Sequence, residues 1–169
     1  NADSGRTGQD VAVADLDGDG DTDAVVANGG TAAHTVYTND GDSTLSLTTV
    51  GDGDGRGVAL GDLDRDGSPE ALIATASSQQ NRFLDNDGTG LGGGDSGAFG
   101  THRTSRDVAI GDLNGDGDPD ALFANNGANG VYNNTGNAAP FGAADQDLGS
   151  ADSRAVALGD VDGDGDLDA

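Results

Sequence analysis

The sequence predicts an all-β fold built from repeated units of four short antiparallel strands. A nine-residue acidic pattern, D-x-D-x-D-G-x-x-D, begins at Asp15, Asp62, Asp112 and Asp160, so it recurs at intervals of about 48 residues. Short apolar runs with a period of two residues flank the copies, which is typical of strands. No long stretch shows helical periodicity. Units of this length with four strands are typical of β-propeller blades.

The first predicted strand of each unit directly precedes an acidic loop, at residues 11–14, 58–61, 108–111 and 156–159. Larger apolar residues alternate there with Ala or Gly. We therefore expect the large face of each strand to pack into a core, while the small face lets another sheet approach closely. Residues 1–9 contain Gly, Ser and Asp and are expected to form a linker.

Three further runs complete the predicted unit. A second strand follows each of the first three loops, at residues 24–27, 71–74 and 121–124. A third run, which includes an aromatic residue, covers 35–37, 82–84 and 131–132 and ends in a turn rich in Asn, Asp and Gly. The fourth strand is clear at 45–50 and weaker around Phe99 and Phe141, each of which precedes a glycine. The acidic loop thus joins the first strand to the second.

The acidic loops have the composition of a calcium site. Asp15, Asp17 and Asp19 occupy alternate positions, so a tightly wound loop can direct three carboxylates inward, and the glycine that follows permits a sharp turn. Asp21 would offer its backbone carbonyl and Asp23 would close the shell. Such oxygen donors suit calcium, whereas magnesium prefers a stricter octahedron with several waters and zinc prefers His or Cys.

The same positions recur in all four loops, and we expect one Ca2+ in each, about four in total. The candidate metal ligands are Asp15, Asp17, Asp19, Asp21 and Asp23 in loop 1, Asp62, Asp64, Asp66, Ser68 and Glu70 in loop 2, Asp112, Asn114, Asp116, Asp118 and Asp120 in loop 3, and Asp160, Asp162, Asp164, Asp166 and Asp168 in loop 4.

Two other interpretations of the loops are weaker. Four solvated acidic turns without metal would crowd like charges at a high electrostatic cost. EF-hands begin with the same letters but need Glu at the twelfth position, which here holds Val26, Ile73 or Phe123. Glu70 replaces the last Asp of loop 2, and Asn114 replaces the second Asp of loop 3, so we expect altered affinity at these two sites.

Composition excludes several classes of function. The formal net charge is −24, with 31 acidic residues against seven arginines and no lysine, which makes nucleic acid an unfavourable partner. More than half of the acidic residues lie in the loops, so the charge is mainly a feature of the metal sites. The chain has no Cys, and its longest purely apolar runs have four residues, so we expect neither disulfides nor membrane insertion. Its start at Asn1 suggests an excerpt of a longer protein.

The run SRDVAIGDLNGDGDPDALFAN at residues 105–125 resembles the calcium-binding repeat called FG-GAP or VCBS, and Phe99-Gly100 and Phe141-Gly142 resemble its "FG" element. The resemblance covers essentially the whole chain. It implies the β-propeller of integrin α subunits and of many secreted microbial proteins, with the loop carboxylates as calcium ligands on one rim. It also implies an extracellular or cell-surface location.

We expect a single repeat domain over 1–169, a partial propeller with repeats at 10–56, 57–106 and 107–154 and the start of a fourth at 155–169. The favoured function is a non-catalytic module for adhesion, ligand binding or surface assembly. Its ligand would be a protein or a carbohydrate, and self-association is open. Two alternatives remain, namely the propeller module of a carbohydrate-binding or polysaccharide-cleaving enzyme, and a subunit of an extracellular filament.

Arg56, Arg106 and Arg154 recur two residues before the predicted first strands, where the first repeat has Gln9. Each arginine can pair with carboxylates of its own or an adjacent unit, which is the structural interpretation. The functional interpretation is a ring of cations that faces an acidic ligand.

Overall fold

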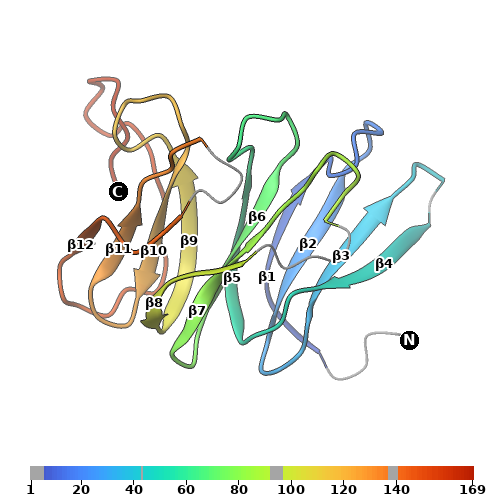
Figure 1. Cartoon of the computed structure of the whole chain (residues 1–169), viewed down its shortest axis with the longest axis horizontal. Coiled ribbons are helices and arrows are strands. Elements are labelled where there is room, and N and C mark those ends of the chain that lie inside the picture. Colours follow the sequence, from blue (N-terminus) through green and yellow to red (C-terminus); the bar gives the residue numbers. More distant parts are fainter. Residues whose placement is uncertain (1–5, 43, 92–96, 137–140) are drawn as a thin grey trace.

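The computed structural model describes residues 6–42, 44–91, 97–136 and 141–169, and this part of the chain is all-β without a helix. Twelve strands form three antiparallel sheets of four strands each (Figure 1). Sheet 1 contains β1 (Thr7–Ala14), β2 (Asp23–Gly29), β3 (His34–Asn39) and β4 (Leu45–Val50); sheet 2 contains β5 (Gly55–Gly61), β6 (Glu70–Thr75), β7 (Gln79–Leu84) and β8 (Gly97–Arg103); sheet 3 contains β9 (Ser105–Gly111), β10 (Asp120–Asn125), β11 (Asn129–Tyr132) and β12 (Gln146–Leu148).

Strand order follows the sequence in every sheet, and the acidic loop closes the hairpin between the first two strands. The register places the last residue of the first strand opposite the ninth loop residue, as in the Gly61–Glu70 and Gly111–Asp120 pairs. All the loops consequently lie along one edge of the stack, at the top of Figure 1. This confirms the predicted place of the loops between the first and second strands.

The sheets stack face to face and share two cores, one between each neighbouring pair. The first core joins sheets 1 and 2, and there Val58 and Leu60 of β5 lie in the cluster that also contains the small residues Ala12 and Ala14 of β1. The second joins sheets 2 and 3 in the same way. The first strands of neighbouring sheets are in contact, because β5 lies against both β1 and β9. The predicted division into a large face and a small face is therefore confirmed for β5, whose Val58 and Leu60 lie in the first core and whose Ala59 packs against the second. The large residues of β1, Val11 and Val13, are instead 57% and 62% exposed.

Aromatic rings fill the second core. Phe99 of β8 contacts Phe123 and Tyr132 edge to face, with ring centroids 5.7 Å and 5.4 Å away. Phe141 lies 5.2 Å from Phe99, centroid to centroid. Such contacts add specific geometry to the burial of large apolar surface, so the aromatic residues of different strands fix how sheets 2 and 3 meet.

Each of the three first strands contains one β-bulge at the same place. The ladder skips one residue between β1 and β2, between β5 and β6, and between β9 and β10, and the residue left over is Gln9, Arg56 or Arg106 respectively. Bulges redirect a side chain and increase the local twist of a strand. The recurring position noted in the sequence is therefore a conformational feature of the fold.

Three sequence expectations were wrong. Thr7–Gln9, expected in a linker, belong to β1, whereas residues 1–5 lie outside the described part. The fourth strand of sheet 3 is β12, beyond Phe141, because the Phe141 ring packs into the second core instead of alternating along a ladder. Residues 156–159 form no strand beyond an isolated Gly159–Asp168 bridge. The amide of Val156 donates instead to the Asp107 carboxylate of sheet 3 at 2.9 Å.

Candidate metal centres

The first aspartate holds each loop together from its start. In loop 1 the carboxylate oxygens of Asp15 accept hydrogen bonds from the amides of Gly18, at 2.8 Å, and Gly20, at 3.0 Å. The first aspartates of loops 3 and 4 receive the same two bonds. Both glycines have positive φ, 77° and 94°, which turns their amides toward the carboxylate. The sequence identified the second glycine of each loop, but not the left-handed position two residues earlier.

The third and fifth loop residues repeat one local arrangement. One oxygen of each accepts a hydrogen bond from the amide two residues ahead, as in Asp21 N to Asp19 Oδ1 at 2.8 Å. The other oxygen is left free of this bond. In loops 1 and 2 carboxylate oxygens of the first, third and fifth residues all lie within 4.8 Å of one another. These triads could hold a metal ion, because a short segment brings several oxygen donors to one point.

Loops 3 and 4 depart from this triad in different ways. In loop 3 the side chain of Asn114 supplies an amide oxygen where the other three loops have a carboxylate. This oxygen accepts a hydrogen bond from the backbone amide of Asp116 at 2.9 Å, as the third residue does in the other loops. In loop 4 the group within 4.8 Å consists of Asp160, Asp162 and Asp168, so the predicted donor Asp164 is not part of it. All three residues of that group are exposed.

The ninth loop residue has a role that sequence reasoning missed. Asp23 is 1% exposed, and its two oxygens accept the amides of Leu16 and Asn39, both at 2.8 Å. Asp120 accepts the equivalent amides of Leu113 and Asn134. This carboxylate thus joins the loop, the second strand and the turn after the third strand. Only its remaining lone pairs could face an ion.

Glu70 breaks this arrangement in loop 2. Its Oε2 accepts the Leu63 amide at 2.6 Å, but Oε1 is buried without a hydrogen-bond partner. Asp62 Oδ1 in the same loop is also buried without one. Burial, reinforced by the charges of Asp64, Asp66 and Asp62, raises the pKa of Glu70 to about 7. Two orphaned carboxylate oxygens in one loop fit a cation, since leaving buried acceptors unpaired is costly.

The seventh loop residue directs its side chain away from the triad. A Cβ on Gly41 would lie 2.4 Å from Asp21 Oδ2, and one on Gly136 would lie 3.2 Å from the Asp118 carboxylate. These side chains therefore lie over the turn that follows the third strand. The geometry is compatible with the expectation that this position offers its backbone carbonyl to an ion.

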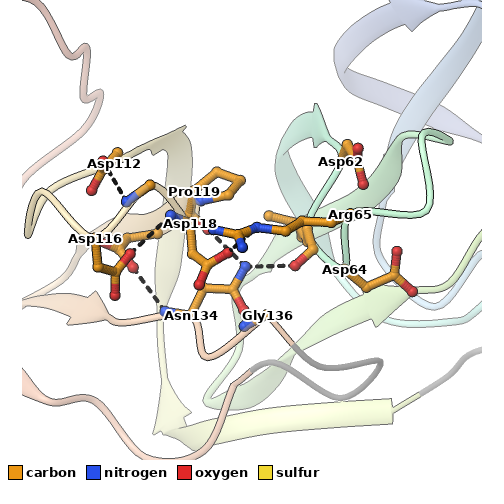
Figure 2. A network of polar contacts seen from close by, with 12 residues as sticks. Asp62, Asp64, Arg65, Asp112, Asp116, Asp118, Pro119, Asn134 and Gly136 are labelled. Carbon is orange, nitrogen blue, oxygen red and sulfur yellow. Dashed lines mark hydrogen bonds and ion pairs between the residues drawn. The ribbon is translucent and has the colours of Figure 1, made fainter.

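Loops 2 and 3 are connected directly. Arg65 occupies the left-handed position that is glycine in the other loops, with φ of 67°. Its guanidinium extends to the neighbouring loop, where Nε lies 2.6 Å from Asp118 Oδ1 (Figure 2). The contact is an ion pair without the angle of a hydrogen bond.

Two equivalent asparagines connect loops 1 and 2 to the sheet that follows each loop. The Asn86 amide of sheet 2 donates to the Leu16 carbonyl in loop 1 at 2.8 Å, and the Asn134 amide of sheet 3 donates to the Leu63 carbonyl in loop 2 at 2.6 Å. Both side chains are buried. The sequence shows these residues only as part of an Asn-x-Gly turn, and the recurrence of that turn is the one signal that could have identified them.

A comparison with family models matches the FG-GAP-like repeat at residues 15–73 and 112–169, which together cover more than half of the chain. No match was found among curated proteins. In the described part, no helix is long and apolar enough to cross a membrane. Both matched ranges begin at the first aspartate of an acidic loop, and each range contains two of the four loops. The chain belongs to the FG-GAP-like repeat family.

Proposed function

We propose that the chain is a calcium-stabilised, non-catalytic module of an extracellular adhesion or ligand-binding protein. Repeats of this family occur in adhesion and ligand-binding modules, are generally non-catalytic and are typical of extracellular proteins. The observation that carries the proposal is the geometry of the acidic loops. In three of them carboxylate oxygens converge, and among the described residues no His or Cys joins these groups. Oxygen-only donor sets of this kind favour calcium.

The proposed ions would be bound by the first, third and fifth side chains, the seventh backbone carbonyl and the ninth carboxylate, one ion in each loop. Calcium would neutralise carboxylates that otherwise repel one another, and it would give a partner to the orphaned oxygens of Asp62 and Glu70. Binding to the folded state alone stabilises that state, by about 2.7 kcal/mol at a concentration of a hundred times Kd.

The three sheets would be consecutive blades of a propeller. Their in-order strands, shared cores and adjacent first strands support this arrangement. The expected repeats at 10–56, 57–106 and 107–154 would then each contain most of one blade, although β5 and β9 begin two residues before these boundaries, at Gly55 and Ser105. The physical reason is that a four-stranded sheet buries both faces only when it lies between two others. A protein or carbohydrate ligand would bind to the exposed surface of such a ring.

Calcium titration of the chelator-treated protein tests the proposal. We expect saturable heat of binding in isothermal titration calorimetry, with Kd values of roughly 10⁻⁴–10⁻³ M, and a Tm that rises with calcium at constant ionic strength. Asp66→Ala should remove one site, whereas Asp87→Ala, which changes an acidic turn residue outside the loops, should leave the number of sites unchanged. A Tm and a titration that do not respond to calcium would refute the proposal.

A further inference from the structure

The edge of the stack opposite the acidic loops carries a cluster of cations. A cavity of about 350 Å³ opens there between sheets 2 and 3, lined by Arg56, Ala76, Thr104, Arg106 and Arg154. Three of the seven arginines of the chain thus line one cavity, and no carboxylate lines it, although the chain has 31 acidic residues. We propose that this cavity, here called the arginine pocket, binds a polyvalent oxyanion such as a sulfate or phosphate group.

The fold itself directs two of these side chains. Arg56 and Arg106 are the extra residues of the β-bulges in β5 and β9. A bulge turns the side chain out of the regular alternation of the strand. Because β5 and β9 lie against each other, their equivalent bulges bring the two arginines to the same cavity. Arg154 occupies the corresponding position of the fourth repeat.

The third arginine is placed by backbone contacts with sheet 3. The Ser153 amide donates to the Asn125 carbonyl at 2.9 Å, and Arg106 Nη1 donates to the Ser153 carbonyl at 2.9 Å. Arg154 follows directly, is exposed, and forms no hydrogen bond or ion pair with the described residues. Its guanidinium therefore lies at the pocket without a partner of its own.

Nearby carboxylates neutralise the pocket only in part. Arg56 pairs with Asp54 at 3.0 Å and donates to Gln9 at 3.2 Å. Arg106 lies 3.9 Å from Asp152, too far for a hydrogen bond. Each guanidinium has five N–H donors, so most donors of the three arginines are free of protein acceptors.

A polyvalent oxyanion matches this set of donors. Guanidinium groups bind sulfate, phosphate and carboxylate through paired, charge-assisted hydrogen bonds. The acidic loops lie at the opposite ends of the same strands, and salt screens exposed charges beyond about 8–10 Å. The local arginines rather than the net charge of −24 therefore determine what this cavity attracts. An anion in the arginine pocket would need no metal in the acidic loops.

The chain also supplies a natural comparison. The neighbouring cavity between sheets 1 and 2, of about 440 Å³, is lined by Arg56 together with Gln9, Thr7 and Gly29. Gln9 there occupies the bulge position that Arg106 occupies in sheet 3. Arg106→Gln consequently copies a residue that the fold already uses at this bulge, and Arg154→Gln changes an exposed side chain.

Titration with inorganic sulfate, followed through the arginine Nε–H signals in NMR, tests the proposal in calcium-saturated protein at constant ionic strength. We expect saturable shifts of Arg56, Arg106 and Arg154 with Kd of about 1 mM. Arg106→Gln and Arg154→Gln should each weaken binding about tenfold. Arg82→Gln, which removes the same charge outside the pocket, should bind sulfate like the wild type.

A second titration with glucose 6-phosphate, which like inorganic sulfate carries two negative charges at mildly alkaline pH, separates two sources of the anion. Equal affinity for both compounds would mean that the free inorganic anion is a sufficient ligand. Tighter binding of the ester would mean that the pocket recognises an anionic group attached to a larger molecule. Both results support the pocket. The proposal is overturned if neither compound gives saturable shifts, or if binding persists unchanged in both pocket variants. An equal loss of affinity in Arg82→Gln would also overturn it, because only net charge would then matter.

Discussion

The Nε atom of Arg65 lies 2.6 Å from Oδ1 of Asp118, so the acidic loops of two neighbouring sheets are joined by an ion pair. Arg65 has φ of 67°, a conformation that disfavours residues with a Cβ. Equivalent positions in the other loops are Gly18, Gly115 and Gly163, with φ between 77° and 80°. Loop 2 thus has a side chain, that of Arg65, at a position where the other loops have glycine. This side chain connects loop 2 to loop 3.

Substitutions at Arg65 should separate the backbone strain from the ion pair. Arg65→Ala keeps a Cβ at positive φ but loses the pair, so it should lower the free energy of unfolding by about 0.5–1 kcal/mol. Arg65→Gly loses the same ion pair but also relieves a backbone strain of about 1–2 kcal/mol, at an entropy cost of about 0.5–1 kcal/mol for the glycine. Its free energy of unfolding should therefore stay close to that of the wild type. Urea unfolding measures both. An Ala variant as stable as the Gly variant would contradict a strained conformation.

The buried asparagines that connect the sheets should be costly to remove. Asn134→Ala leaves the carbonyls of Leu63 and Pro119 without their amide donor, and Asn134 is only 2% exposed. We expect a loss of about 2–3 kcal/mol in the free energy of unfolding, because buried polar groups without partners are expensive. Thermal and urea unfolding measure the loss. Asn133→Ala is the matched control, and a similar loss in both variants would argue against the inter-sheet bond as the cause.

Acid should weaken a second inter-sheet link. Burial favours a raised pKa for Asp54, but hydrogen bonds from the Gly30 amide, Ser77 and Arg56 outweigh it and lower the pKa below its usual value. A lowered pKa in the folded state stabilises the fold above the unfolded-state pKa of about 3.9, and this contribution disappears as the pH falls through the folded-state pKa.

Asp54→Asn should therefore lower the free energy of unfolding by about 1–2 kcal/mol at neutral pH, and the difference from wild type should shrink below about pH 4. Urea unfolding across this pH range measures the difference. Asp52→Asn, at a 72% exposed side chain, serves as the control with little expected effect. A difference for Asp54→Asn that does not change with pH would show that the charge of Asp54 is unimportant.

Loss of one loop should loosen the structure locally. Asp112→Ala removes the acceptor of the Gly115 and Gly117 amides, at 2.7 Å and 2.9 Å, and leaves the other loop carboxylates close together. Hydrogen exchange should accelerate at residues 108–124, while loop 1 stays protected, because stacked repeats contact mainly their neighbours. Asp145→Ala is a control outside the loops. Uniform loss of protection along the chain would indicate one cooperative unit and contradict local damage.

The sequence by itself determined the features that depend on neighbouring residues along the chain. The period of two residues located most of the strands, and the D-x-D-x-D-G pattern located the loops, because both arise from local backbone geometry. The alternation of Val58 with Ala59 and of Val108 with Ala109 also predicted which faces meet. These patterns reach only a few residues. The structure confirmed the strands and loops of sheets 1 to 3, but the large face of β1, with Val11 and Val13, is exposed instead of packed in a core.

Only the tertiary structure decided the relationships between sheets. Asn134 and Leu63 are 71 positions apart, so no local pattern pairs them. Phe141 resembled part of a strand but packs against the core between sheets 2 and 3. The equivalent bulges at Arg56 and Arg106 likewise become one pocket only when β5 and β9 lie side by side. Distant residues meet because the sheets stack. Stacking buries the apolar faces of the sheets and gives buried polar groups hydrogen-bond partners in the neighbouring sheet, and the sequence of a single repeat does not specify these partners.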